Sequence, residues 1–303
     1  MTEGDAALAQ LQVLRPAPGV FAFYAGRVPG LRFAAGPNWV DDGALSLGIA
    51  SYALVEGDAA LVYDTHVSRP HAAAIRRRLA AEGVRHFTVV LSHWHLDHVA
   101  GTAEFADCEV IANVRTAAHL AARRAAIEAG TDHGPPAIAP LVLPTRTFDG
   151  RLRLRVGGRP VELLTADIHS DDATLLWLPE AGLLLAGDTL EDPLTYVGEP
   201  LALPRHLAEL DRLAGLGATA ILPNHGAAAR IAAGGYGPAF IPATQAYIRW
   251  LLGLRDAPGR AGEAPTEILA GPLADGTLRW FAPYAAVHQQ NVRRVLAEVG
   301  TDG

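Results

Sequence analysis

Apolar and polar positions along the chain follow two periods. Short apolar runs closed by turn residues are typical of buried strands, and stretches with apolar residues every three or four positions are typical of amphipathic helices. The apolar runs predict strands at residues 49–55, 59–64, 84–92, 151–164 (as a hairpin), 173–178, 183–186 and 218–222. The helical pattern predicts helices at residues 70–82, 99–105, 115–129, 204–216, 242–255 and 284–299. Strands and helices interleaved in this order predict a layered α/β protein.

The composition indicates a folded chain and argues against a polyanionic partner. Hydrophobic residues make up 50% of the 303 positions and charged residues 19%, which excludes a disordered chain. The formal net charge is -7, and the chain contains arginine but no lysine. Because proteins that bind nucleic acid favour a basic face, we expect no nucleic-acid partner. The absence of lysine also excludes Schiff-base chemistry and a lysine-dependent phosphate loop.

The single cysteine and the composition of residues 1–10 bear on the cellular compartment of the protein. Cys108 is the only cysteine, so no disulfide framework stabilises the chain, which fits a reducing compartment. Residues 1–10 are acidic and rich in alanine, and they lack the basic and apolar regions of a signal peptide. No apolar stretch is long enough to span a bilayer. We therefore expect a cytoplasmic protein that does not associate with membranes.

Histidine or aspartate residues follow four of the predicted strands. His93 comes directly after the strand at 84–92, and the others, each within a few residues of a strand end, are His169, Asp188 and His225. Loops at one edge of a sheet are where α/β folds place their sites, because the strands hold the loop ends rigidly. We therefore expect four separate strand ends to converge on one point.

The segment from residue 93 to residue 98 carries the strongest local signal. It places three imidazoles and one carboxylate within six residues, namely His93, His95, Asp97 and His98. Neutral imidazole and carboxylate together suit zinc and similar cations. The alternation of histidine with Trp94 and Leu96 would direct His93 and His95 to one side of the chain and the two apolar side chains to the core. This pattern predicts a metal site.

The segment resembles the HxHxDH signature of the metallo-β-lactamase superfamily. Three later positions are similar to that family in their order: His169 after a strand, Asp188 in Ala-Gly-Asp-Thr, and His225 in Pro-Asn-His-Gly. Asp64 resembles the early aspartate of the family, which usually contacts a ligand rather than the metal. The resemblance extends from about residue 49 to residue 226.

The resemblance implies the fold class and the domain organisation. The fold would be α/β, a four-layer αββα sandwich with the metals at one edge of two packed sheets, followed by additional C-terminal helices. We expect residues 1–303 to form a single domain, with the core at about 18–228 and a helical C-terminal extension at about 238–300.

The resemblance also implies the ligand set and the cofactor. His93, His95 and His169 would hold one metal ion. Asp97, His98 and His225 would hold a second ion, and Asp188 would bridge the two. We expect two zinc ions, with iron or manganese as the alternatives. Two such ions lower the pKa of a shared water and supply a hydroxide nucleophile, and either Asp97 or Asp188 would accept or transfer the proton.

Departures from individual branches of the family narrow the expected activity. True β-lactamases of this fold generally place cysteine or serine where Asp188 stands, whereas a bridging aspartate resembles the lactonase, glyoxalase II and phosphodiesterase branches. Flavodiiron proteins place glutamate at the position of His95. We therefore expect a dinuclear zinc hydrolase that opens an ester-like bond, favouring a lactone, in a small molecule. A glyoxalase II-like thioesterase, a phosphodiesterase and an iron-dependent persulfide dioxygenase remain as alternatives, and a homodimer is an open expectation.

Further residues are expected around the site. Tyr196, after Asp188, and Tyr236, in the glycine-containing stretch 234–240, are candidates to contact a carbonyl or oxyanion, and packing in the core is the alternative. We expect residues 234–240 to fold over the site, and residues 115–143 are a candidate lid by position alone. Asp171 and Asp172 are candidates to orient an imidazole or to cap a loop.

Overall fold

The computed structural model of the protein describes residues 3–299, and its strands form two sheets. Residues 1, 2 and 300–303 of the expected domain lie outside the described residues. In order across the first sheet, the strands are β1 (Gln12–Ala17), β2 (Val20–Ala25), β3 (Ile49–Glu56), β4 (Ala59–Tyr63), β5 (His86–Val90), β6 (Glu109–Asn113) and β7 (Arg146–Phe148). The second sheet has β12 (Ala220–Pro223), β11 (Leu183–Gly187), β10 (Ser170–Leu178), β9 (Arg159–Ile168) and β8 (Arg151–Val156) in that order.

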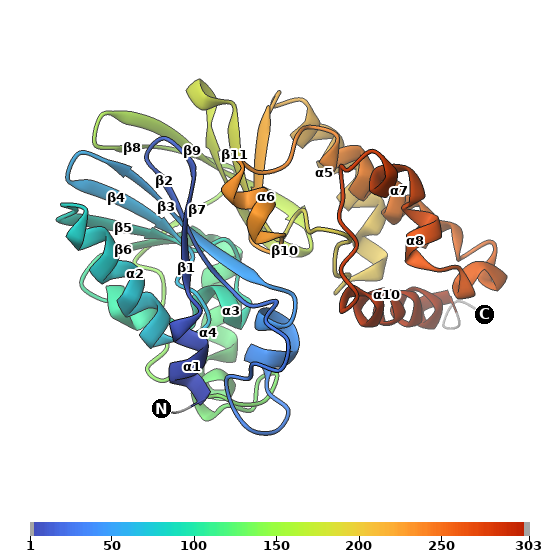
Figure 1. Cartoon of the computed structure of the whole chain (residues 1–303), viewed down its shortest axis with the longest axis horizontal. Helices are drawn as coiled ribbons and strands as arrows, with labels where there is room; N and C mark the ends of the chain where they lie inside the picture. The colour runs from blue at the N-terminus through green and yellow to red at the C-terminus, as the bar shows by residue number, and fades with distance from the viewer. Residues whose placement is uncertain (1–2, 300–303) are drawn as a thin grey trace.

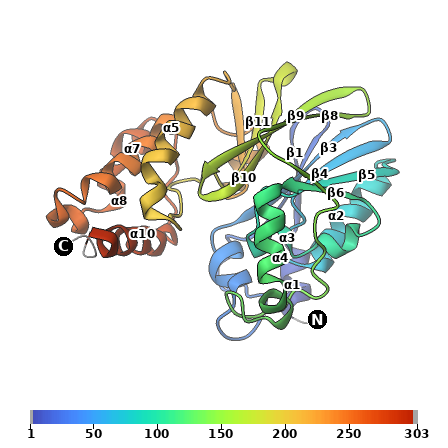
Figure 2. The same cartoon turned by 180° about the vertical axis from the view of Figure 1, so that it is seen from behind.

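Helices flank both sheets (Figures 1 and 2). The α-helices are α1 (Glu3–Ala9), α2 (Arg69–Ala81), α3 (Leu96–Val99), α4 (Val114–Ala129), α5 (Leu203–Ala214), α6 (Ala228–Ala232), α7 (Phe240–Gly253), α8 (Pro265–Ile268), α9 (Ala270–Ala274) and α10 (Tyr284–Val299). A π-helix, η1 (Val40–Leu45), precedes β3. The 3-10 helices are η2 (Thr102–Phe105), η3 (Pro179–Ala181), η4 (Pro200–Ala202) and η5 (Pro258–Gly262).

The arrangement of the apolar side chains defines four layers. Between the sheets, Tyr52 of β3 and Leu176 of β10 belong to one buried cluster. On the outer face of the first sheet, Ile75 of α2 and Leu120 of α4 belong to a second cluster. Beyond the second sheet, α5, α7 and α10 contribute to a third cluster, which includes Ile248 of α7. The expected four-layer αββα sandwich with additional C-terminal helices is therefore confirmed.

The secondary structure differs from the expectation in a few segments. Residues 99–105 were expected to form one helix, but α3 ends before Gly101 and η2 begins after it. A Cβ atom on residue 101 would lie 2.1 Å from the carbonyl oxygen of Thr65, so this position requires glycine, and glycine weakens a continued helix. Strands β1, β2, β6 and β7 were not predicted; β2 is buried at all six positions and lacks the alternation of a half-exposed strand.

Two buried histidines should make the free energy of unfolding depend on pH. Burial lowers the pKa of His71, in α2, to about 4, and burial lowers the pKa of His206, in α5, to about 4 as well. Because the unfolded chain binds these protons near pH 6.5 and the folded chain does not, stability is lost as the pH falls from about 6.5 to 4. At 1.36 kcal/mol per pKa unit, each residue contributes a loss of roughly 3 kcal/mol.

The variant His71→Gln isolates one of these contributions. Urea unfolding at pH 7 and at pH 4 should show a smaller acid-induced loss of unfolding free energy in the variant than in the parent chain, by up to roughly 3 kcal/mol. An equal loss in both proteins would contradict the neutral, buried state of His71.

Within residues 3–299, no helix combines the length and the apolar composition needed to cross a membrane.

Candidate metal centre

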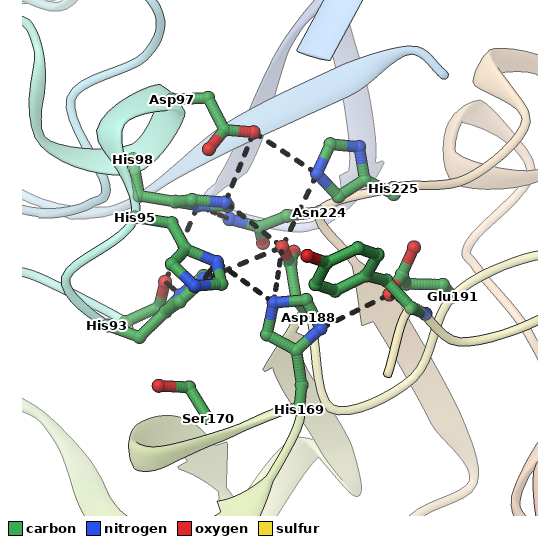
Figure 3. Close-up of polar contacts among 12 residues, drawn as sticks. His93, His95, Asp97, His98, His169, Ser170, Asp188, Glu191, Asn224 and His225 are labelled. Atoms are coloured by element: carbon green, nitrogen blue, oxygen red, sulfur yellow. Dashed lines mark hydrogen bonds and ion pairs between the residues drawn. The ribbon is translucent and has the colours of Figure 1, made fainter. Parts of the chain in front are cut away.

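Four loops bring the predicted site residues to one edge of the two sheets (Figure 3). His93 and His95 follow β5, while Asp97 and His98 lie in α3. His169 lies in the turn between β9 and β10 with a φ angle of 67°. The chain leaves β11 through Gly187, whose φ is 56° and whose Cβ atom would lie 3.0 Å from the hydroxyl of Tyr63. Asp188 and His225 follow the ends of the parallel strands β11 and β12. The expected convergence of strand ends is present.

Three imidazoles form the first group of candidate ligands. His93 Nε2 lies 2.9 Å from His95 Nδ1, and His169 Nε2 lies 3.0 Å from the same nitrogen. These ligand atoms and an oxygen of Asp188 all lie within 4.8 Å of one another. The group matches the first ligand set that the sequence predicted.

The second group consists of one carboxylate and two imidazoles. Asp97 Oδ2 lies 3.5 Å from His98 Nε2 and 3.3 Å from His225 Nε2. The side chain of His225 is oriented by its other nitrogen, because Nδ1 donates a 2.8 Å hydrogen bond to the carbonyl oxygen of Gly48. This bond leaves the lone pair of His225 Nε2 directed at the cluster.

Asp188 lies between the two groups. Its Oδ2 atom is 3.1 Å from His98 Nε2, 3.4 Å from His225 Nε2, and 3.6 Å from both His93 Nε2 and His169 Nε2. Its other oxygen, Oδ1, is buried and has no hydrogen-bond partner among the described residues. A buried carboxylate oxygen without a donor is costly unless a cation accompanies it. The donor set therefore fits metal ions, with Asp188 in the position of a bridge.

The electrostatics of the two groups suit a cation. Burial, together with the charge of His98, lowers the pKa of His93 well below its usual value, and burial and His169 do the same for His95. Both imidazoles are therefore neutral, as metal ligation requires. Burial also acts on His98 and His225, but the Asp188 carboxylate reverses its effect and raises the pKa of both. A cation at these two nitrogens would compete with protons.

Asp64 contacts the second group at the His98 nitrogen that does not face the cluster. It is fully buried, and its Oδ1 accepts a 2.7 Å hydrogen bond from the backbone N–H of Ser92. Its Oδ2 lies 2.9 Å from His98 Nδ1 and accepts a 2.5 Å hydrogen bond from Asn224 Nδ2. A carboxylate at Nδ1 leaves Nε2 free for a metal, and Asp64 thus contacts a candidate ligand.

The two aspartates after His169 differ in what they contact. Asp172 accepts a 2.9 Å hydrogen bond from the backbone N–H of Trp94 and therefore fixes the loop that carries His93 and His95. Asp171 instead lies 2.7 Å from His119 Nε2, at the surface. His119, Asp171 and Asp172 form a third cluster of possible metal ligands, separate from the two groups around Asp188.

A cavity of about 270 Å³ opens onto the candidate ligands. It is lined by Trp39, Gly43, Leu47, His95, Leu96, Asp97, His133, His169, Asp188, Glu191, Tyr196 and His225. Among these described residues there is no arginine, and the chain has no lysine. The cavity thus combines one polar wall of ligand candidates with walls that are mainly apolar or aromatic.

The two tyrosines predicted for the site have different positions. Tyr196 lines the cavity, and its ring centre lies 5.7 Å from that of His169. Tyr236 is not among the residues that line it. Its buried hydroxyl donates a 2.6 Å hydrogen bond to Asp192 and accepts one from the backbone N–H of Ala227. Because both hydrogen-bonding positions are occupied by the protein, the expectation that Tyr236 contacts a substrate oxygen needs correction.

The two candidate lids have different positions. Tyr236 forms an isolated β-bridge with Ile221 of β12, and none of residues 234–240 lines the cavity, so the expectation that they fold over the site needs correction. In the other candidate, α4 packs outside the first sheet through Leu120 and Ile127. His133, from the loop after that helix, is the residue of this segment that lines the cavity.

Glu191 is a buried residue of the site that sequence reasoning missed. Its Oε1 lies 3.3 Å from His169 Nδ1 and accepts a 2.9 Å hydrogen bond from the backbone N–H of Tyr196. Only 1% of its surface is exposed, which is rare for a glutamate. The one signal in the sequence is its place beside Asp192, just after the apolar residues that follow Asp188.

Comparison with known proteins gives one family. A family model described as "Metallo-beta-lactamase superfamily" matches residues 46–253. The chain is 26% identical over 181 residues to the beta-lactamase-like protein 2 homolog of Caenorhabditis elegans, which covers 59% of this chain and 56% of that protein. It is 31% identical over 155 residues to the 2,4-dinitroanisole O-demethylase subunit alpha of a Nocardioides strain, covering 49% of this chain and 44% of that protein. The chain thus spans about half the length of these curated relatives.

Solved structures show the same fold at low sequence identity. A metallo-beta-lactamase from Pontibacter korlensis superposes with a TM-score of 0.61 and 16% identity, covering 79% of this chain and 99% of that chain. The metallo-beta-lactamase FIM-1 from Pseudomonas aeruginosa, in a mono-zinc form, superposes with a TM-score of 0.59 and 16% identity, covering 79% of this chain and 95% of that chain.

Proposed function

This chain belongs to the metallo-beta-lactamase superfamily, and from that premise we propose that it is a dinuclear zinc hydrolase that opens an ester-like bond, above all a lactone, in a small molecule. The observation that carries the proposal is the position of Asp188 Oδ2, between 3.1 and 3.6 Å from one nitrogen each of His93, His98, His169 and His225. One carboxylate oxygen at the centre of two groups of donors is the arrangement that a bridged pair of cations requires.

The residues of the chain have distinct tasks in this proposal. Two bound cations would supply a hydroxide nucleophile near neutral pH and polarise the scissile carbonyl. The five histidines, Asp97 and Asp188 are the ligands. Asp188 lies between the two groups, and Asp97, which also lines the cavity, is the candidate to accept or return a proton. The Tyr196 hydroxyl is the candidate donor to the carbonyl oxygen.

The cavity walls support a neutral substrate. Trp39, Leu47 and Leu96 offer apolar surface, and none of the described lining residues is an arginine. A carboxylate or phosphate distant from the reacting bond would therefore enter a cavity without a cationic side chain, beside the carboxylate of Glu191. This favours a lactone or simple ester over a glutathione thioester, whose carboxylates need cationic partners.

Metal analysis and a substrate panel test the proposal. Protein purified without added metal should contain about two zinc ions per chain. A neutral lactone should be hydrolysed with a kcat/KM at least about ten-fold higher than a matched lactone that carries a carboxylate on its side chain, because an unpaired buried polar group costs about 1–3 kcal/mol. One iron per chain with oxygen uptake would instead indicate a dioxygenase, and preferential turnover of the anionic substrate would contradict the neutral class.

A further inference from the structure

The last helix of the chain contacts the loop that leads away from Asp188 (Figure 1). Asn291 of α10 is fully buried, and its side-chain amide donates a 2.8 Å hydrogen bond to the carbonyl oxygen of Thr195. Its amide oxygen accepts a 2.9 Å hydrogen bond from the backbone N–H of Val197. Arg294, one turn later, donates to the carbonyl oxygen of Val197 at 2.6 Å and lies 4.5 Å over the ring of Tyr196. The helix thus fixes the backbone on both sides of Tyr196.

The first turn of α10 reaches Glu191. The hydroxyl of Tyr284 donates a 3.2 Å hydrogen bond to Glu191 Oε2, and both side chains are almost completely buried. Burial raises the pKa of Tyr284 well above its usual value, so the hydroxyl keeps its proton and remains a donor. The other oxygen of Glu191 is bound to the backbone of Tyr196 and lies 3.3 Å from His169 Nδ1. A continuous set of contacts therefore joins α10 to a candidate metal ligand.

The direction of the His169 ring depends on its Nδ1 partner. An imidazole has one proton-bearing nitrogen and one acceptor nitrogen when neutral. His169 Nδ1 has no hydrogen-bond partner among the described residues, and the Glu191 carboxylate 3.3 Å away favours the proton on this nitrogen through its charge. Nε2 then presents its lone pair to the cluster, where it lies 3.0 Å from His95 Nδ1. His169 also has a positive φ of 67°, and its backbone therefore needs support from its surroundings.

We propose that α10 is a positioning element of the metal centre: Tyr284 and Asn291 hold the segment from Glu191 to Val197, and Glu191 fixes the tautomer and orientation of His169. This inference rests on the proposed function, because it takes His169 to be a ligand. It assigns the C-terminal helical region a direct effect on the affinity of the site, although no residue of α10 belongs to either group of candidate ligands. Contacts of this kind beside a ligand change metal affinity by about 10–100-fold.

Three variants test the proposal by metal affinity. Zinc affinity is measured by competition with a chromophoric chelator, and urea unfolding of the metal-free proteins is measured in parallel. Tyr284→Phe removes the hydroxyl that contacts Glu191. Gln245→Leu is the control, since this buried amide in α7 donates a 2.7 Å hydrogen bond to Asp211 of α5 and makes none to α10 or Glu191 among the described hydrogen bonds. Glu191→Gln replaces the carboxylate itself.

The expected order of effects is specific. Glu191→Gln should weaken the binding of one zinc equivalent by about 10–100-fold, and Tyr284→Phe should weaken the same equivalent by a smaller factor of roughly three to ten, in line with one neutral hydrogen bond. Gln245→Leu should stay within about two-fold of the parent chain in zinc affinity, although it also loses one buried hydrogen bond. Equal zinc affinities in Tyr284→Phe and Gln245→Leu, or no loss in Glu191→Gln, would overturn the positioning proposal alone. Failure of the parent chain to bind zinc would overturn the proposed function, and the positioning proposal with it.

Discussion

Replacement of Asp188 by alanine should remove at least one of two bound metal ions and lower kcat/KM by more than about 100-fold. Mutation of a residue that only contacts a metal ligand lowers metal affinity or activity by about 10–100-fold. Loss of a ligand shared by both ions should therefore have a larger effect. The reason is geometric, because Asp188 Oδ2 lies within 3.6 Å of nitrogens in both groups. Elemental analysis and lactone hydrolysis measure the two effects.

Asp171→Ala is the matched control for this prediction. Asp171 follows His169 by two positions and has an imidazole partner in His119, yet it belongs to neither group around Asp188. Both variants lose one aspartate, and only Asp188→Ala should lose metal. Full metal content in Asp188→Ala would show that the carboxylate does not bridge, and the ligand assignment would then fail at its central residue.

The second large effect is expected for Asp64→Asn. The variant keeps an oxygen that can accept from the backbone N–H of Ser92, but its new amide nitrogen faces His98 Nδ1 and Asn224 Nδ2, where the carboxylate accepts hydrogen bonds. His98 Nδ1 would then become the acceptor, and its proton would move to Nε2, the atom directed at the metals. Zinc affinity at the second group should fall by about 10–100-fold or more. The free energy of unfolding of the metal-free chain should fall by about 1–3 kcal/mol, because two buried donors face each other.

Asp192→Asn provides the comparison for Asp64→Asn. Asp192 is equally buried, and its side chain accepts hydrogen bonds from the Tyr236 hydroxyl and the backbone N–H of Arg279. The contact of Asp192 with a candidate ligand runs from its backbone N–H to the carbonyl oxygen of His225, which the substitution leaves in place. Urea unfolding should show a loss of stability in both variants, whereas chelator competition should show a loss of zinc affinity in Asp64→Asn alone. If both variants bound zinc equally well, Asp64 would contribute only to folding.

The sequence predicted the parts of the site that depend on local spacing. His93 to His98 were recognisable because the residues are adjacent in the chain and follow one apolar run. His169, Asp188 and His225 were found because each follows a strand, and the strand ends meet at one edge of the sheets. The structure brings these seven side chains together, and their metal ligation remains a prediction for the experiments above.

Other parts of the site depend on contacts that no local pattern carries. Glu191 is joined to Tyr284 across 93 positions, and Tyr236 is joined to Asp192 across 44. A tyrosine after two glycines resembles a site residue as much as a core residue until its partner is known, which explains the error at Tyr236. Strand β2 was missed although its six buried residues form one apolar run of the kind that predicted the other buried strands.

The contact between α10 and Glu191 also determines when during synthesis the site becomes complete. A growing chain that has been made as far as His225 already contains all seven candidate ligands, but the hydroxyl that holds Glu191 lies in a helix that begins at Tyr284. Contacts between positions so far apart form late in folding. If α10 positions His169 as proposed, the nascent chain acquires its full affinity for zinc only after Tyr284 and the rest of α10 have left the ribosome, well after the last candidate ligand.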